Sequence, residues 1–174
     1  SVGASNFAPA RLASALDIAA REGVARYPVM QPLYNLLERD FEAALRGLCL
    51  ERDLGVIAYF GLARGYLTGK YRSIDDLSKS RRGSGVRAYI EGKGPRVLAV
   101  MDAIAAGRGT GLAAIALAWL MAKPGVTAPI ASATSVEQLA DTGTYARGDA
   151  PARRGGRLIR RAAPNQSSVP KTLS

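Results

Sequence analysis

The stretch Gly55-Val56-Ile57-Ala58-Tyr59 is a short apolar run that ends in an aromatic residue. Three further apolar runs end in a polar residue, and they span residues 2–6, 28–31 and 127–132. In a βα-barrel the loops at the carboxyl ends of the parallel strands build the binding site. The four runs therefore predict parallel strands whose terminal side chains gather at one end of a barrel-like sheet.

Helical patterns lie between these runs. Pro9 suits a first helical turn, and apolar residues then recur at helical spacing until Gly23 stops the pattern. A second helix is predicted from Leu37 to about residue 53. Residues 61–95 are rich in Gly, Ser, Arg and Lys and predict a loop, whereas residues 96–106 and 112–123 predict two more helices. This alternation predicts an α/β fold with right-handed crossovers.

Length and composition limit what this fold can be. The chain has 174 residues, 48% of them hydrophobic, which supports one core but falls short of the roughly 250 residues of a complete βα-barrel. We found no leader-like segment, and the apolar stretch 112–122 is too short to span a bilayer, so we expect a cytoplasmic protein without a membrane partner. The single cysteine, Cys49, is expected to be a buried, inert thiol on the inner face of a helix.

The positive charge is concentrated at the carboxyl end. Residues 1–141 contain 17 Lys and Arg against 13 Asp and Glu, a net +4, whereas residues 142–174 contain seven against one, a net +6. The second segment is also rich in Gly, Ala and Pro, which predicts a disordered basic tail. Such a tail could bind a polyanion, but with a single aromatic residue, Tyr145, it predicts no specific nucleic-acid recognition.

Six motifs follow one another in residues 1 to about 141. They are Gly3-Ala4-Ser5-Asn6-Phe7, Gln31-Pro32-Leu33-Tyr34-Asn35-Leu36-Leu37, Gly55-Val56-Ile57-Ala58-Tyr59, Leu62-Ala63-Arg64-Gly65-Tyr66-Leu67-Thr68-Gly69-Lys70-Tyr71, Ala116-Leu117-Ala118-Trp119 and Ala133-Thr134-Ser135-Val136-Glu137-Gln138-Leu139. In this order they resemble the aldo-keto reductases, which are NADP(H)-dependent carbonyl reductases. The resemblance implies a partial (β/α)8 TIM barrel that contains roughly the fifth to eighth βα units. Residues 1–141 would form this NADP-binding half-barrel, and the tail at 142–174 would follow it.

The resemblance also implies a nicotinamide site. Ser5, Asn6 and Gln31 match residues that hold the carboxamide, and their hydroxyl and amide groups suit that partner because each both donates and accepts hydrogen bonds. Tyr59 matches the aromatic residue on which the nicotinamide ring stacks. The alternatives from the residues alone are a helix cap at Ser5-Asn6, a loop tie at Gln31 and core packing at Tyr59.

Two further segments match the phosphate contacts of the family. The segment 61–70 matches the loop over the pyrophosphate, and its implied contacts are Gly61, Leu62, Arg64, Gly65 and Lys70. The helix start at 132–141 matches the site of the adenosine 2′-phosphate, with implied contacts at Ser132, Ser135, Gln138 and Asp141. A solvated basic loop and an ordinary helix cap are the respective alternatives. Many relatives have Ser-Pro where this chain has Phe60-Gly61, and Thr142 stands where asparagine is common.

No catalytic or metal-binding residue is assigned. The family's catalytic tyrosine, lysine, aspartate and histidine come from earlier strands, and this sequence contains no histidine. After residue 141 the leucine pattern of the expected last helix stops, which suggests a shifted reading frame.

Three hypotheses remain. In the first, the chain is the cofactor-binding half of a reductase that acts on a small carbonyl substrate, and it is inactive alone. In the second, it is a non-catalytic remnant, or an NADP-binding module that pairs with another chain or with itself through open barrel edges. In the third, its function lies in the basic tail.

Overall fold

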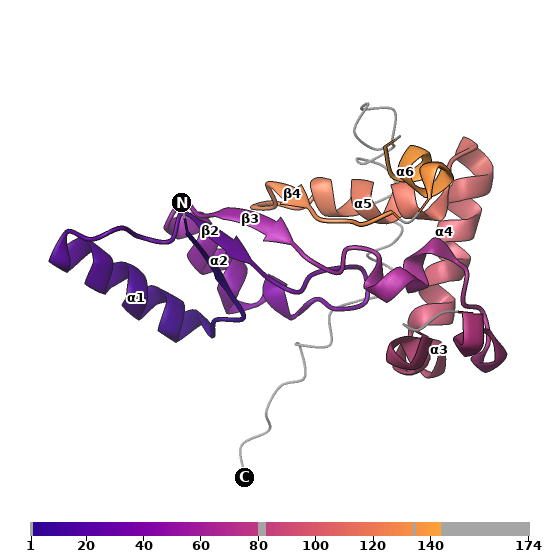
Figure 1. Cartoon of the computed structure of the whole chain (residues 1–174), viewed down its shortest axis with the longest axis horizontal. Coiled ribbons are helices and arrows are strands. Elements are labelled where there is room, and N and C mark those ends of the chain that lie inside the picture. The colour runs from indigo at the N-terminus through magenta and orange to yellow at the C-terminus, as the bar shows by residue number, and fades with distance from the viewer. Residues whose placement is uncertain (1, 80–82, 134, 144–174) are drawn as a thin grey trace, which may run out of the picture.

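The computed structural model describes residues 2–79, 83–133 and 135–143. Its centre is one sheet of four parallel strands in the order β1-β2-β3-β4 (Figure 1). The strands are β1 (Gly3–Ser5), β2 (Val29–Gln31), β3 (Gly55–Ala58) and β4 (Ala128–Pro129). Each strand lies beside the next one in the chain, so helical crossovers must connect them. The four predicted strands and the α/β class are confirmed.

Burial alternates along the strands. Ala4, Met30 and Val56 are at most 2% exposed, and Ala58 is fully buried, whereas Val29 and Ile57 on the opposite face are only partly buried. Because successive side chains of a strand point to opposite faces, one face of the sheet packs against the helices and the other is more open.

The first crossover forms as predicted. Helix α1 (Pro9–Glu22) starts with proline in its first turn and ends at Gly23, whose φ of 65° is the left-handed conformation that glycine adopts most readily. The alternative role of Ser5-Asn6 as a helix cap is wrong, because Ala8 occupies the cap position and no side chain caps this helix.

The second helix starts later than the sequence predicts. Helix α2 spans Ala44–Glu51, and the 3₁₀ turn η1 (Asp40–Glu42) precedes it. The prediction of a start at Leu37 is wrong because the side-chain oxygen of Asn35 accepts hydrogen bonds from the backbone N–H groups of Leu37 and Glu38, at 2.8 and 2.9 Å. These bonds form a turn that competes with helix. Cys49 lies in α2 and is 1% exposed, and burial raises the pKa of its thiol.

The long loop predicted at 61–95 is largely wrong. Its described residues form the 3₁₀ segments η2 (Ala63–Thr68), η3 (Ile74–Lys79) and η4 (Gly83–Val86) and the short helix α3 (Arg87–Glu91). Tyr66, Leu67 and Tyr71 are at most 1% exposed. These residues belong to the hydrophobic core, and their burial orders the segment.

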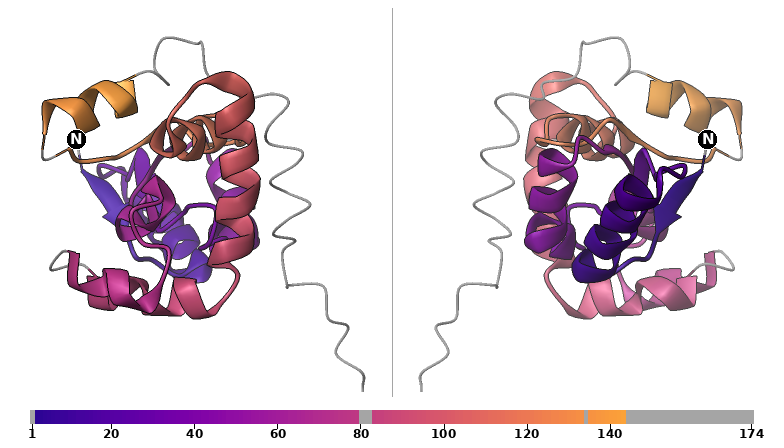
Figure 2. Two further views of the ribbon diagram at one scale, coloured as in Figure 1. Left: turned by 90° about the vertical axis from the view of Figure 1, so that its right-hand side faces the viewer. Right: turned by 90° about the vertical axis from the view of Figure 1, so that its left-hand side faces the viewer.

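The last described elements are the helices α4 (Gly94–Arg108), α5 (Leu112–Met121) and α6 (Val136–Gly143). The first two confirm the helices predicted at 96–106 and 112–123. Figure 2 shows the strands nearly end-on, with α6 (orange) above them and α4 (salmon) to one side. Strand β4 is shorter than the predicted run 127–132, because its partner β3 ends at Ala58 and the chain turns at Phe60, where φ is 54°.

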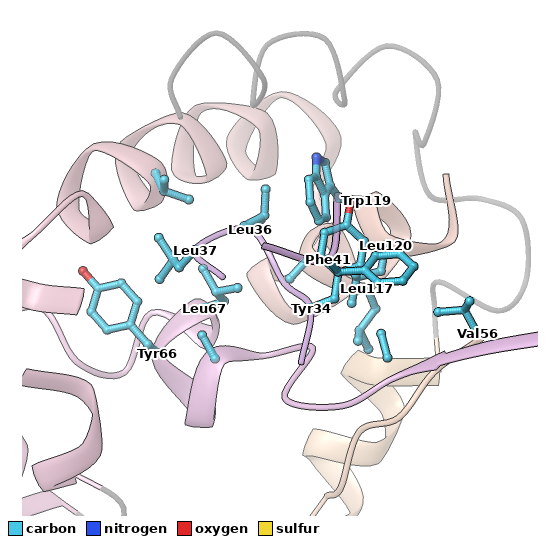
Figure 3. Packing of buried hydrophobic residues seen from close by; sticks show 14 of the residues in the cluster. Tyr34, Leu36, Leu37, Phe41, Val56, Tyr66, Leu67, Leu117, Trp119 and Leu120 are labelled. Atoms are coloured by element: carbon cyan, nitrogen blue, oxygen red, sulfur yellow. The ribbon is translucent and has the colours of Figure 1, made fainter. Parts of the chain in front are cut away.

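The core lies between the sheet and these helices. In Figure 3 the rings of Tyr34, Phe41 and Trp119 pack together beside Leu117 and Leu120. The ring centroid of Tyr34 is 5.1 Å from that of Phe41 and 5.4 Å from that of Trp119, distances typical of favourable aromatic pairs.

In the part of the chain that the structure describes, none of the helices alone has the length and apolarity to cross a membrane; α4 and α5 meet that test only as a pair, across a bend of 101°. The disordered tail was predicted from residue 142, and for residues 142 and 143 this prediction is wrong, because α6 continues to Gly143. The rest of the predicted tail, residues 144–174, lies outside the described residues, as do the side chains of 141–143.

Candidate functional site

The carboxyl ends of the first three strands bring together the residues predicted to hold a nicotinamide. Ser5 lies opposite Gln31 in the parallel register, and its hydroxyl donates a hydrogen bond of 3.0 Å to the Gln31 carbonyl oxygen. The Tyr59 hydroxyl donates to Oδ1 of Asn6 at 2.9 Å, across 53 residues of sequence. Two bonded pairs, the Ser5 side chain with the Gln31 backbone and the Tyr59 side chain with the Asn6 side chain, therefore lie at one edge of the sheet.

The backbone fixes the position of Tyr59. Its N–H donates to the Pro32 carbonyl at 3.0 Å, and its carbonyl accepts from the Tyr34 N–H at 3.4 Å. The ring is only partly buried and lies 5.2 Å from the Phe60 ring in an edge-to-face arrangement. Tyr59 thus keeps part of its surface open to solvent at the strand end, which does not favour the alternative of simple core packing.

The segment 61–70, which the family resemblance predicts over a pyrophosphate, follows Tyr59 and Phe60. Phe60, Ala63 and Arg64 have φ between 47° and 57°, and Gly65 has a φ of 90°. Left-handed backbone is costly for residues with a side chain, so this segment has a conformation that its surroundings must impose. Leu62 is partly buried here.

Two basic residues flank the glycines of this segment. The Arg64 guanidinium lies 4.4 Å from the centre of the Phe60 ring, and the Lys70 ammonium lies 4.8 Å from that of Tyr71. A side chain at Gly65 would contact Lys70, its Cβ lying 3.2 Å from Cε, so Gly65 and Lys70 are close together. Both cations are exposed, which leaves their charge available to an anion. A Cβ at the buried Gly61 would lie 3.0 and 3.2 Å from Leu120 and Leu117, which accounts for a small residue there.

The third predicted group lies at the start of α6. The Ser135 hydroxyl accepts a hydrogen bond of 3.3 Å from the Gln138 N–H, so the helix cap expected there is confirmed. Hydrogen bonds from its own backbone N–H and from Ser135 lower the pKa of Glu137. Ser132 is exposed, and the side chain of Asp141 lies outside the described residues. Helix α5 packs against both α6 and η2, and thus supports the second and third groups from one helix.

One residue that the sequence reasoning did not single out ties these parts together. Asn35 is fully buried, and its side-chain N–H donates a hydrogen bond of 3.0 Å to the Phe60 carbonyl, while its oxygen accepts the two bonds that shape the turn before η1. An asparagine directly after an apolar strand region signals a turn, but its partner 25 residues away is not visible in the sequence.

A buried charged cluster was also missed. Glu42 accepts hydrogen bonds from the Tyr34 hydroxyl at 2.5 Å and the Arg39 Nε at 2.9 Å, and its carboxylate lies 3.4 Å from the Lys123 ammonium. Burial alone would raise the pKa of Glu42, but the bonds from Arg39 and Tyr34 and the charge of Lys123 lower it to about 2. Burial, followed by the bond to Glu42, raises the pKa of Tyr34. Both cations also lie over the Trp119 ring, at 5.4 Å for Arg39 and 4.1 Å for Lys123, so the cluster joins η1 to α5.

This parallel sheet and its strand-end residues agree with the comparison to known sequences. The sequence profile of the Aldo/keto reductase family matches residues 1–147, and the chain belongs to that family. Its fold, a TIM barrel, is consistent with a four-stranded parallel sheet that makes up part of a barrel.

Several curated relatives show which proteins the chain is similar to. It is 35% identical to the uncharacterized oxidoreductase YrpG of Bacillus subtilis over 141 residues, which cover 81% of this chain and 42% of the relative. It is 32% identical to the L-glyceraldehyde 3-phosphate reductase of Escherichia coli, over 79% of this chain and 42% of the relative. It is also 32% identical to the chloroplastic pyridoxal reductase of Arabidopsis thaliana, over 80% of this chain and 37% of the relative. The chain spans about two fifths of the length of these relatives.

Proposed function

We propose that residues 1–141 are the NADP(H)-binding half of an aldo-keto reductase, corresponding to the fifth to eighth βα units of the barrel, and that the whole enzyme reduces a small aldehyde or ketone to an alcohol. The observation that carries this proposal is the pair of hydrogen bonds, from Ser5 to the Gln31 backbone and from Tyr59 to Asn6, at the carboxyl edge of the sheet. In barrels of this kind that edge holds the site. The relatives named above, two reductases and an oxidoreductase, support the reaction class.

The residues present fit such a cofactor chemically. The amides of Asn6 and Gln31 and the Ser5 hydroxyl both donate and accept hydrogen bonds, as a carboxamide requires. The bond from the Tyr59 hydroxyl to Asn6 holds the ring against rotation, so that a nicotinamide stacked on Tyr59 would present one face to the substrate. The bound cofactor would supply the hydride.

The phosphate groups would be held by the other two parts of the site. The segment 61–70 combines exposed positive charge with a backbone that a ligand can approach closely. Its contacts with the pyrophosphate would be Gly61, Leu62, Arg64, Gly65 and Lys70. The first turn of a helix attracts anions, so the start of α6 would hold the adenosine 2′-phosphate. The contacts there would be Ser132, Ser135, Gln138 and Asp141. A preference for NADPH over NADH follows from this second group.

A titration of the full chain with NADPH, read through the fluorescence of the single tryptophan, tests the proposal. We expect saturable binding that Tyr59→Ala abolishes. The matched variant Tyr59→Phe, which keeps the ring and loses only the hydroxyl bond to Asn6, should weaken binding by about fivefold, the equivalent of one net hydrogen bond of about 1 kcal/mol. A folded wild-type chain that shows no saturation would refute the proposal.

A second proposal concerns the edges of the sheet. Within the described residues, β1 and β4 each pair with a single neighbouring strand, and the face that carries Val29 and Ile57 is only partly covered. Unpaired strand edges bind further strands readily. We propose that these edges pair with the βα units that complete a barrel, supplied by another chain or by a second copy. Sedimentation of the chain alone and with the first half of an aldo-keto reductase tests this; a monomer in both cases would refute it.

A further inference from the structure

We propose that Asn35 and Arg72 are positioning residues that clamp the segment 60–70 at its two ends and so hold it ready for the cofactor. The inference rests on the proposed function, since it assigns a purpose to the conformation of a segment placed there at the pyrophosphate. Neither residue belongs to the contacts assigned above. Both act on the segment through its backbone carbonyl groups.

The first clamp is at Phe60. The Asn35 side-chain N–H donates to the Phe60 carbonyl at 3.0 Å, and the same carbonyl accepts from the Ala63 N–H at 2.7 Å. Asn35 is itself fixed, because it is fully buried and its oxygen accepts the N–H groups of Leu37 and Glu38. Its amide uses a donor and an acceptor on two separate atoms, and aspartate, which has the same shape, lacks the donor when it is ionised.

The second clamp is at Gly69. The Nε of Arg72 donates to the Gly69 carbonyl at 2.9 Å, while its two terminal nitrogens donate to the Asp102 carboxylate at 2.6 and 2.8 Å. Asp102 lies in α4, so the fork of one guanidinium fastens the end of the segment to a long helix. Lysine would preserve the charge but not this arrangement of three donors in one plane.

The segment needs such clamps because of its own backbone. Five residues of the segment, Phe60, Ala63, Arg64, Gly65 and Gly69, have positive φ, and three of these have side chains that disfavour it. Without the clamps this part of the chain would relax into other conformations, and a ligand would have to order it again on binding. Holding the bound conformation in advance removes that cost.

Three conservative variants of the full chain remove one clamp each. Asn35→Asp keeps the acceptor oxygens and loses the donor to Phe60, Arg72→Lys keeps the charge and loses the fork, and Asp102→Asn weakens the anchor in α4. Arg87→Lys is the control, because the Arg87 pair with Glu91 is exposed and lies on α3. Binding of NADPH and of adenosine 2′-monophosphate is measured by calorimetry, and amide hydrogen exchange is measured without ligand.

Each clamp variant should weaken NADPH binding by about five- to thirtyfold, as expected for loss of one or two net hydrogen bonds of about 1 kcal/mol each. Binding of adenosine 2′-monophosphate, which needs only the start of α6, should stay unchanged, as should both affinities of Arg87→Lys. Amide exchange at Gly65, Leu67 and Gly69 should become faster in the variants.

Equal losses for both ligands would reduce the two residues to a general structural role and overturn the inference. So would NADPH affinities within about twofold of wild type together with unchanged exchange. If the wild-type chain bound no NADPH, the proposed function would fail, and the exchange rates alone would decide whether Asn35 and Arg72 hold the segment.

Discussion

Replacement of Glu42 by glutamine is expected to destabilise the protein strongly. The carboxylate lies between Arg39 and Lys123, whose side chains are 7% and 10% exposed, and its own side chain is 9% exposed. Lowering its pKa from 4.5 to about 2 on folding corresponds to a contribution of about 3 kcal/mol. Loss of one partner of a buried ion pair costs about 3–5 kcal/mol. Both routes predict that Glu42→Gln lowers the free energy of unfolding by about 3 kcal/mol at pH 7.

Urea unfolding followed by Trp119 fluorescence measures this change, and Trp119 contacts both cations of the cluster. Glu91→Gln is the matched control, because its ion pair with Arg87 is exposed on both sides and should contribute less than about 0.5 kcal/mol. A loss below about 1 kcal/mol for Glu42→Gln would refute the reasoning, since the buried carboxylate would then add no more than a surface one.

The pH dependence of the free energy of unfolding tests the contribution of the Glu42 carboxylate in a second way. The pKa of Glu42 is lower in the folded chain than in the unfolded one, so its contribution is complete above about pH 4.5 and is lost as the pH falls toward 2. The stability difference between wild type and Glu42→Gln should therefore shrink below pH 4.5 and vanish near pH 2. A difference that persists at pH 2 would mean that the charge is not its source.

Two further predictions concern packing. Gly94→Ala should destabilise the chain by about 2 kcal/mol, because the new Cβ would overlap the Tyr89 carbonyl oxygen and lie 2.5 Å from the Tyr66 hydroxyl. Gly107 lies in the same helix, and a Cβ there would have no neighbouring atom within 4 Å. Gly107→Ala should therefore stabilise the chain by about 0.5–1 kcal/mol. Thermal unfolding of the pair checks both signs; equal shifts would contradict the packing. Cys49 should react with a thiol reagent about 100-fold more slowly in the native chain than in urea, and comparable rates would show that it is not buried.

The strands and most helices could be predicted from the sequence because local pattern determines them. Apolar runs such as Gly55–Ala58 are bounded by polar turns, and α1 has both a starting proline and a terminating glycine. The start of α2 could not be predicted, because the turn made by Asn35 outweighs the helical spacing of Leu37 and Phe41. The ordered segments within 61–95 were missed for a related reason: the buried Tyr66 packs against Tyr89, 23 residues further along the chain, and no local period predicts that contact.

The candidate site divides in the same way. Ser5, Asn6, Gln31 and Tyr59 stand at the ends of predicted strands, and their proposed roles came from the family resemblance. The structure bonds Ser5 to the Gln31 backbone and Tyr59 to Asn6. Asn35 and Arg72 were not identified, because their partners Phe60 and Asp102 lie 25 and 30 residues away. Such contacts depend on the folded arrangement and leave no periodic signal in the sequence.

Amide chemical shifts of the full chain, recorded by NMR during titration with NADPH, test the location of the cofactor site most directly. Shift changes should concentrate at Asn6, Gln31 and Tyr59, along the segment 60–70 and at residues 135–138, and NADH should leave the last group unchanged. Saturable shifts confined to other parts of the chain, or none at a concentration that saturates an intact aldo-keto reductase, would contradict the assignment of this edge of the sheet as the nicotinamide site.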